Sequence, residues 1–400
     1  MMDIPLSLTR ILEYGASVHG DTTVTTWHGE GTGSEFDPAE EVTFRDIAAR
    51  AAAFAHAIHD ELGITSDERV GSFMWNCAEH LEVMFGTACK GAIFAPLNKQ
   101  LMNDQIRHII NHAEISAIVC DPRLAQQLGK VLVGTDSVGS VIITGAQPAQ
   151  QFAHLFPRGV EVYSYEALID GRSTVYDWPE LDERTAAALC YSTGTTGAPK
   201  GVLYSHRSLY LEAMQLRSSD SLCITHGETF LCCIPICHVL SWGVPFTCFM
   251  TGTPLVLPDA DVSAPTLAKA IAATSPRVAH GVPTIWIQLF VHYMHHPPER
   301  MTLTEIYAGG SPVPPMLIKM WEERYGVDVV HVWGMVETST VGSVARPPQG
   351  ASGDTRWAYR VSQGRIPASL EYRVVNDGQV VARTCLLYTS DAADERSSVD

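Results

Sequence analysis

Short apolar segments alternate with segments of helical spacing through the first third of the chain, and this alternation constrains the fold more than any other feature. Thr43 and Asp46 form a capping-box pattern, and Phe54, Ile58 and Leu62 follow at helical spacing. Strands that alternate with helices predict parallel sheets covered by helices on both faces. We expect helices at about 43–62, 78–88, 104–112 and 124–132, and strands at about 70–73, 92–96, 117–120 and 141–144.

The same alternation returns in the second half of the chain. Residues 145–184, rich in prolines and polar clusters, are expected to connect two such sheets. The fold class is therefore α/β, with sub-parts at about 1–180 and 181–345. In the second sub-part we expect strands at 230–234, 278–281 and 306–308, and helices at 265–273, 283–293 and 314–325.

A glycine-rich segment, YSTGTTGAPKGV, occupies Tyr191 to Val202. Its glycines allow close backbone approach to a ligand, and its N–H groups, hydroxyls and one ammonium suit anionic oxygens. Pro199-Lys200-Gly201 does not match a Walker loop, and Gly31-Thr32-Gly33 has Phe36 where a Rossmann fingerprint needs glycine. The segment predicts phosphate binding, with an ordinary turn as the alternative.

This segment resembles the phosphate loop of the acyl-adenylate-forming enzymes, with Ser192 and Thr193 in interchanged order. Further segments resemble the family in the right order, up to about Val381. The most similar group is the medium- and long-chain fatty acyl-CoA synthetases. The matching segments are SFMWNCAEHLEVMFGTACKGAIFAPLN at 72–98, QIRHIINHAE at 105–114, GVPTIW at 281–286 and HVWGMVET at 331–338.

The resemblance implies the large N-terminal domain of these enzymes. That domain has two parallel-type sheets with helices on their faces, followed by the start of a small β-barrel-like part. We expect it at 1–384, with a β-rich part at 346–384. The family continues into a Thr-Gly-Asp, a basic hinge and a mobile lid domain with a lysine, and we expect this lid to be absent. Residues 385–400 contain CLLYTSDAADER, which resembles a translated sequencing adapter, so we expect a non-native tail there.

By the same resemblance, two groups of residues bind ATP. The phosphate loop surrounds the phosphates, and the second group forms the adenine pocket, although a simple turn would look the same at 309–311. Thr193 and Lys200 are the expected catalytic residues of the loop. The loop residues are Thr193, Gly194, Thr195, Thr196, Gly197 and Lys200, and the adenine group is Gly309, Gly310, Ser311, Trp333 and Gly334.

The segment around Glu337 is expected to hold Mg²⁺, because a hard divalent ion between phosphate oxygens prefers oxygen ligands. The resemblance makes Trp333 the ring that stacks near adenine and assigns a threonine hydroxyl to the α-phosphate. Val336 stands at the threonine position and has no hydroxyl. Loss of that contact could cost about 1.5–3 kcal/mol at the transition state.

His238 lies in IPICHVLSWGVPF, which resembles the segment beside the acid-binding pocket, and it is expected to line the carboxylate site. A core histidine is the alternative. Cys232, Cys233 and Cys237 with His238 could suggest a metal site, but the CxxC pairing typical of structural zinc is absent. Between Glu228 and Asp259 there is no charged residue, yet prolines and glycines interrupt the stretch, so we expect buried elements and no integral membrane segment.

The implied reaction has two steps. The carboxylate of a fatty acid attacks ATP to give an acyl-adenylate and pyrophosphate, and a thiol, coenzyme A, then displaces AMP. An acyl-AMP ligase that serves a carrier protein, an aryl-acid ligase and an inactive nucleotide- or acyl-binding remnant remain alternatives. The implied cofactors and co-substrates are ATP, Mg²⁺ and CoA.

Composition excludes other classes of partner. The net charge of −17 argues against binding nucleic acid or anionic membranes by bulk electrostatics. Ten cysteines without a regular framework are typical of reduced thiols. Asp3, Pro5, Arg10 and Glu13 interrupt any signal-like apolar run near the start, so we expect a cytoplasmic protein.

Overall fold

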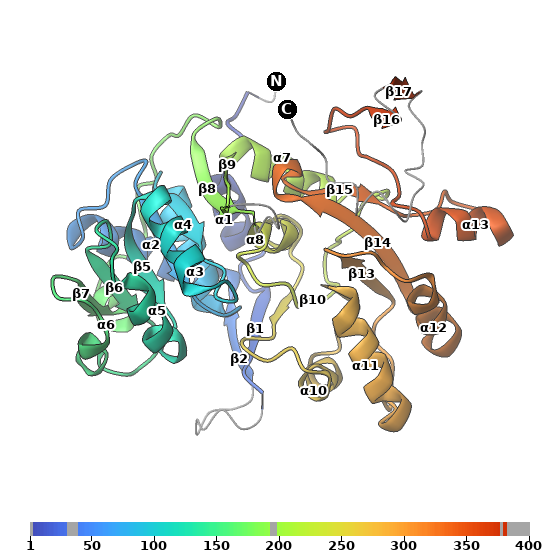
Figure 1. Cartoon of the computed structure of the whole chain (residues 1–400), viewed down its shortest axis with the longest axis horizontal. Helices are drawn as coiled ribbons and strands as arrows, with labels where there is room; N and C mark the ends of the chain where they lie inside the picture. Colours follow the sequence, from blue (N-terminus) through green and yellow to red (C-terminus); the bar gives the residue numbers. More distant parts are fainter. Residues whose placement is uncertain (1–2, 30–38, 193–197, 377–378, 382–400) are drawn as a thin grey trace.

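The computed structural model describes residues 3–29, 39–192, 198–376 and 379–381, and the side chains of 374–381 are not described. Two large sheets dominate this part of the chain (Figure 1). The first has the order β7-β6-β5-β3-β4-β8-β9, and the second has the order β15-β14-β13-β12-β10-β11-β1-β2. A separate hairpin consists of β16 and β17. The α/β class with two sheets is therefore confirmed.

Parallel strands form the centre of each sheet, and every antiparallel strand lies at an edge. In the seven-stranded sheet only β9 runs antiparallel to its neighbour, and in the eight-stranded sheet β2 and β15 do. The strands are β1 Thr23–Trp27, β2 Ala39–Thr43, β3 Arg69–Phe73, β4 Ile93–Pro96, β5 Ile115–Cys120, β6 Ser140–Ile143, β7 Glu161–Ser164, β8 Ala186–Tyr191, β9 Gly201–Ser205, β10 Phe230–Cys232, β11 Leu255–Leu257, β12 Val278–Gly281, β13 Glu305–Gly309, β14 Asp328–Met335, β15 Thr340–Val344, β16 Val374–Asn376 and β17 Gln379–Val381.

Helices fill three layers around the two sheets. Helices α1, α2, α3, α7 and α9 share the largest core, which lies between the sheets. Helices α4 and α5 cover the outer face of the seven-stranded sheet, and α10, α11 and α12 cover that of the eight-stranded sheet. The helices are α1 Leu8–Val18, α2 Phe44–Asp60, α3 Ala78–Cys89, α4 Asn103–Ala113, α5 Ala125–Leu132, α6 Tyr165–Ile169, α7 His206–Leu216, α8 Val239–Trp242, α9 Val244–Thr251, α10 Ala264–Thr274, α11 Pro283–His295, α12 Pro315–Tyr325 and α13 Gly353–Arg360, with short 3-10 turns η1 Pro122–Leu124, η2 Ala149–Gln151, η3 Ala153–Leu155 and η4 Val336–Thr338.

The expected capping box begins α2. The Asp46 N–H donates to Thr43 Oγ1 at 3.1 Å, and the Thr43 N–H donates to Asp46 Oδ2 at 2.9 Å. Gly86 of α3 then allows close packing, because a Cβ there would lie 2.7 Å from the Ala51 carbonyl oxygen of α2. This close helix pair forms the middle of the central layer.

Two expectations about the organisation need correction. Residues 145–184 do more than connect the sheets, because they contain β7, the polar edge strand of the seven-stranded sheet. The sheets also exchange strands across residue 180, since β1 and β2 join the later sheet and β8 and β9 the earlier one. The division into 1–180 and 181–345 therefore does not follow the sheets.

The part at 346–384 was expected to be β-rich, but its first ordered element is the helix α13. Arg360 on this helix is 1% exposed and donates to both Glu322 and Asp328. Arg356 donates to Glu322 at 2.8 Å. These ion pairs fix α13 against α12 and the start of β14, and the β16–β17 hairpin follows.

The uncharged stretch between Glu228 and Asp259 forms several short elements within the fold. Helix α9 within it has eight residues. In the described ranges, no helix has the length and apolar character that crossing a bilayer requires.

Candidate functional site

The glycine-rich segment begins at the end of β8 and reaches the start of β9, and these two strands pair antiparallel. Thr193, Gly194, Thr195, Thr196 and Gly197 lie outside the described residues. Next to the paired strands, the Ser192 N–H donates to the Lys200 carbonyl oxygen at 2.9 Å. Lys200 is exposed beside it. The sequence thus places its phosphate-binding candidates at the end of β8, a carboxyl end of the parallel core.

The hairpin meets the Glu337 segment, which is remote in sequence. The Tyr204 hydroxyl of β9 donates to the Val336 carbonyl oxygen of η4. Glu337 is exposed and lines a small hollow together with Arg184, Tyr204 and Ser205. The two motifs that sequence analysis singled out are therefore adjacent.

A cavity of about 660 Å³ opens between the carboxyl ends of the two sheets. Four predicted site residues, His238, Gly310, Gly334 and Val336, line it together with Tyr191 at the root of the hairpin. Ligands in open α/β folds bind at this end of the strands. Most of the remaining wall is apolar, including Cys233, Ile234, Val239, Trp242, Val282 and Ile285.

Two glycines of the predicted adenine pocket are required by backbone packing. A Cβ on Gly309 would lie 2.3 Å from the Val332 carbonyl oxygen. A Cβ on Gly334 would lie 1.5 Å from the Thr340 carbonyl oxygen, where the β14–β15 pairing shifts register. Both glycines bring strands into close contact at the cavity edge.

Other predicted residues do not line the cavity in the described part of the chain. Trp333 is half-buried, and its ring packs so close to Gly342 that a Cβ there would lie 2.6 Å away. Gly309 is buried under Gly310, and Ser311 is exposed beyond it. The stacking role of Trp333 remains a prediction.

His238 enters the cavity just before a strained turn. Val239, Leu240, Ser241 and Trp242 have φ angles of 36°, 47°, 51° and 58°, so α8 is a left-handed turn, which L-residues rarely form. Ser241 Oγ donates to the Ile234 carbonyl oxygen at 2.8 Å, and Thr340 Oγ1 donates to that of Val239 at 3.2 Å. These tertiary bonds hold the turn.

The electrostatic surroundings of His238 keep it neutral. Burial lowers its pKa, and the nearby Lys99 ammonium lowers it further. Just before it, the Asn76 amide donates to the Ile234 carbonyl oxygen at 2.7 Å and accepts from the Ile236 N–H at 3.0 Å. The His238 segment is therefore fixed to the other sheet.

The cysteines near His238 do not form a metal site. Cys232 Sγ lies 2.9 Å from Ser241 Oγ and 3.6 Å from His280 Nε2, all within the core. Among the residues that the structure describes, no three or more His, Cys, Asp or Glu side chains are grouped as metal ligands.

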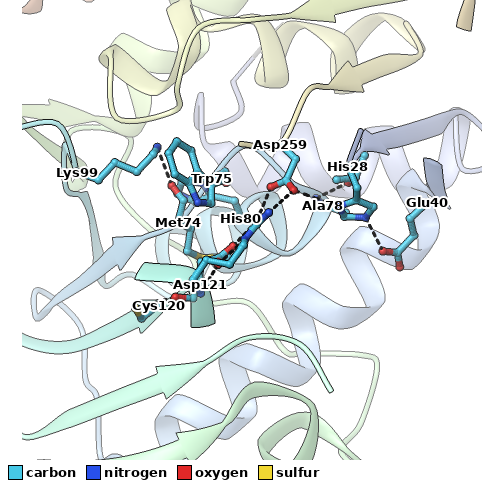
Figure 2. A network of polar contacts seen from close by, with 12 residues as sticks. His28, Glu40, Met74, Trp75, Ala78, His80, Lys99, Cys120, Asp121 and Asp259 are labelled. Atoms are coloured by element: carbon cyan, nitrogen blue, oxygen red, sulfur yellow. Dashed lines mark hydrogen bonds and ion pairs between the residues drawn. The ribbon is translucent and has the colours of Figure 1, made fainter. Parts of the chain in front are cut away.

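Sequence analysis missed the charged residues of the cavity wall, which come from both sheets. Lys99 lies just beyond β4, and Asp259 lies just beyond β11. Asp259 accepts from Arg123 at 2.7 Å and lies 3.1 Å from His28 Nδ1 (Figure 2). The position of Lys99 at the carboxyl end of a predicted strand was the available signal.

The sequence matches the family described as AMP-binding enzyme over residues 12–385. The chain belongs to this family. As an AMP-binding enzyme it is 32% identical over 383 residues to a medium-chain-fatty-acid–CoA ligase of Ectopseudomonas oleovorans, covering 94% of this chain and 68% of the relative. A long-chain-fatty-acid–CoA ligase of Thermus thermophilus is 30% identical, covering 85% of this chain and 59% of the relative.

Solved structures confirm the fold of this AMP-binding enzyme. An anthranilate CoA ligase in complex with anthranoyl-AMP has a TM-score of 0.81 at 22% identity, covering 95% of this chain and 68% of that structure. A long-chain-fatty-acid–CoA ligase from Archaeoglobus fulgidus has a TM-score of 0.78 at 22% identity, covering 95% of this chain and 74% of that structure. The family and the N-terminal-domain fold expected from the resemblance are both confirmed.

Proposed function

We propose that this AMP-binding enzyme activates a carboxylic acid with ATP, forms an acyl-adenylate and transfers the acyl group to coenzyme A. The observation that carries the proposal is the convergence of three remote segments on one cavity. The root of the β8–β9 hairpin, the His238 turn and the Gly334–Val336 segment all line it. In this proposal the acid, the phosphates and the adenine therefore bind next to one another.

In this proposal the protein mainly positions its substrates and neutralises charge. The acid carboxylate oxygen attacks the α-phosphorus, the bond to the β-phosphate oxygen breaks, and pyrophosphate leaves. The thiol of CoA then attacks the acyl carbon, and AMP leaves with the bonding electrons. Thr193 and Lys200 of the glycine-rich segment act on the phosphates, and neutral His238 lies beside the carboxylate.

Mg²⁺ belongs to the proposal through Glu337. Glu337 is exposed at the small hollow beside Tyr204, so its carboxylate oxygens are accessible to a cation. Oxygen ligands suit Mg²⁺, which would neutralise phosphate charge there. We assign Mg²⁺ to Glu337 on this basis.

The names of the relatives favour a CoA acceptor and an aliphatic acid. A medium-chain-fatty-acid–CoA ligase and a 3-methylmercaptopropionyl-CoA ligase are each 32% identical to this chain. A carrier-protein acceptor, an aryl acid and an inactive remnant are the weaker candidates, and only the missing Val336 hydroxyl favours the last.

The test is binding of non-hydrolysable acyl-adenylate analogues, the acylsulfamoyl adenosines, to the 400-residue chain. We expect calorimetry to show that acylated analogues bind about tenfold or more tightly than sulfamoyl adenosine, because the acyl chain enters an apolar cavity. Acid-dependent ATP–pyrophosphate exchange then tests the chemistry. Binding without exchange would support the remnant instead.

Glu337→Gln provides the matched test of the metal. It should weaken the Mg²⁺-dependent part of ATP binding, whereas Glu323→Gln on the exposed face of α12 should not. Failure of every analogue to bind the wild-type chain would overturn the proposed function.

A further inference from the structure

The cavity wall carries one cation that the proposed chemistry does not use. Among the described residues that line the cavity, Lys99 and Asp259 are the only Lys, Arg, Asp or Glu side chains. Lys99 comes from the loop after β4 of the seven-stranded sheet, whereas Gly334 and Val336 come from β14 and η4 at the eight-stranded sheet. The cation therefore lies on a different wall from the adenylate segment.

Lys99 is buried with few partners. The residue is 8% exposed, its Nζ donates to the Met74 carbonyl oxygen at 3.1 Å, and Nζ lies 4.0 Å from the centre of the Trp75 ring (Figure 2). No carboxylate in the described ranges lies within ion-pair distance of it. An ammonium has three N–H donors, and one carbonyl uses only one of them.

The nearest acidic side chains are occupied by other cations. Asp259 is held by both Arg123 nitrogens, each at 2.7 Å, and by His28 at 3.1 Å. Asp121 accepts two bonds from Arg123, at 2.9 and 2.6 Å. These contacts neutralise the two carboxylates, so the Lys99 charge lacks a counter-ion of its own.

A buried, unpaired ammonium is costly unless a ligand brings an anion to it. Most of the residues that line the cavity together with Lys99 and the adenylate segment are apolar, which suits a methylene chain. The reacting carboxylate of the acid belongs at the adenylate segment. The other end of the same acid is then the anion source for Lys99 that the proposed function itself supplies.

We propose that Lys99 is a specificity-determining residue that binds a second carboxylate at the far end of the acid, so that the substrate class is dicarboxylic acids activated at one end. This inference rests on the proposed function. The Lys99 N–H groups donate to the distal carboxylate, and the Trp75 ring beneath restricts the ammonium to the cavity face.

The experiment compares two acylsulfamoyl adenosines of equal chain length, one ending in a carboxylate and one in a methyl group, across chains of four to ten carbons. Calorimetry with the 400-residue chain should show the carboxylate-ended analogue binding about tenfold to a hundredfold more tightly at the best length, the range of a charge-assisted hydrogen bond. Lys99→Met, which keeps the length and apolar stem, should abolish or reverse that preference.

Lys90→Met is the matched control. Lys90 is also buried, at 5% exposure, and donates to a single carbonyl, that of Ile64 at 2.6 Å, but it lies outside the cavity lining. The Lys90→Met variant should leave the preference for the carboxylate-ended analogue unchanged. Lys99→Arg keeps the charge and should retain part of the preference, which separates recognition from folding.

Three results would overturn the inference. The wild type could prefer the methyl-ended analogue at every length, or Lys99→Met could weaken both analogues equally. Lys99→Met could also leave the preference intact while weakening CoA binding, which would assign the anion to a phosphate of the thiol. Failure of both analogues to bind the wild type would instead overturn the proposed function itself.

Discussion

Val336 is the residue at which this cavity departs most clearly from the chemistry that its family motif implies. Its side chain lines the cavity and its carbonyl oxygen accepts from the Tyr204 hydroxyl, so the backbone is held in place whatever side chain it bears. Valine and threonine have nearly the same volume. The difference is one hydroxyl that can donate to a phosphate oxygen.

Val336→Thr should therefore increase acid-dependent ATP–pyrophosphate exchange by about tenfold to a hundredfold, because one charge-assisted hydrogen bond contributes about 1.5–3 kcal/mol at the transition state. The incorporation of labelled pyrophosphate into ATP measures this rate. Val336→Ala, which adds no hydroxyl, should give no increase. An unchanged rate in Val336→Thr would remove the hydroxyl from the mechanism.

Gly309 supports a second prediction at this scale. Gly309→Ala should lower the free energy of unfolding by about 1–3 kcal/mol, since the added Cβ meets the Val332 carbonyl oxygen at 2.3 Å and forces β13 away from β14. Gly139→Ala is the control, because a Cβ at Gly139 would meet nothing closer than the Ser116 carbonyl oxygen at 4.0 Å, apart from its neighbours in sequence. Urea unfolding measures both, and equal losses would contradict the steric explanation.

Motif residues could be assigned from the sequence because their types follow from ligand chemistry. The structure brings Gly310, Gly334, Val336 and His238 to one cavity, and their roles there stay predictions. Lys99 could not be assigned, because its significance depends on burial and on the absence of a partner, which only the packed structure reveals. Trp333 was assigned an adenine role, yet it packs against Gly342.

At the scale of elements, the junction of the two sheets depends on charged groups beside the cavity. His28 follows β1, Arg123 belongs to η1 after β5, and Asp259 follows β11. Bonds to Asp259 and Glu40 raise the pKa of His28 to about 9, while the same cations hold the pKa of Asp259 below its usual range despite its burial. The junction is a paired network (Figure 2).

Stability should therefore depend on pH through His28. Its folded pKa lies above the unfolded value near 6.5, so its contribution is complete below about pH 6.5 and is lost as pH rises through about 9. The low pKa of Asp259 acts oppositely, with a contribution present above about pH 4 and lost as pH falls. We expect the free energy of unfolding of the wild type to exceed that of His28→Gln by about 1–3 kcal/mol at pH 6 and by much less at pH 9.5.

Urea unfolding of both proteins from pH 5 to 9.5 measures this difference. His59→Gln is the control for a histidine substitution as such, because His59 is an exposed residue of α2 that makes none of the bonds of this network. A gap of constant size across the range would show that the raised pKa does not stabilise the junction.

The left-handed turn at Val239–Trp242 marks the limit of element prediction. The run VLSW contains no glycine and would ordinarily form a right-handed helix, so local propensity gives no indication of the turn. Tertiary bonds through Ser241 and Thr340 impose it. By contrast, α2 and β3 to β6 follow local pattern and capping, and they occur where the sequence predicts them.

At the scale of the whole molecule, the chain passes between the sheets several times. Strands β1 and β2 pair with the later sheet, and β8 and β9 return to the earlier one. Long-range pairing of this kind leaves no signal in a local window, so the class was predictable and the strand exchange was not. We therefore expect the two sheets to fold and unfold as one cooperative unit.

A fragment of residues 1–180 should accordingly fail to fold alone, since its β1 lacks β11 and its β4 lacks β8. Circular dichroism melting should show a cooperative transition for the 400-residue chain and none for the fragment. Mixing it with the 181–400 fragment during refolding should restore the transition. A sharp independent melt of 1–180 would contradict the prediction.

The pairing of Val24 with Leu255 also has a consequence for synthesis on the ribosome. The partner of β1 emerges about 230 residues later, which at ordinary translation speeds is roughly 10–50 s. During that interval the nascent β1–β2 hairpin exposes an unpaired strand edge, the kind of surface that aggregates. Efficient production should therefore depend on chaperones that shield the first strands until Leu255 arrives.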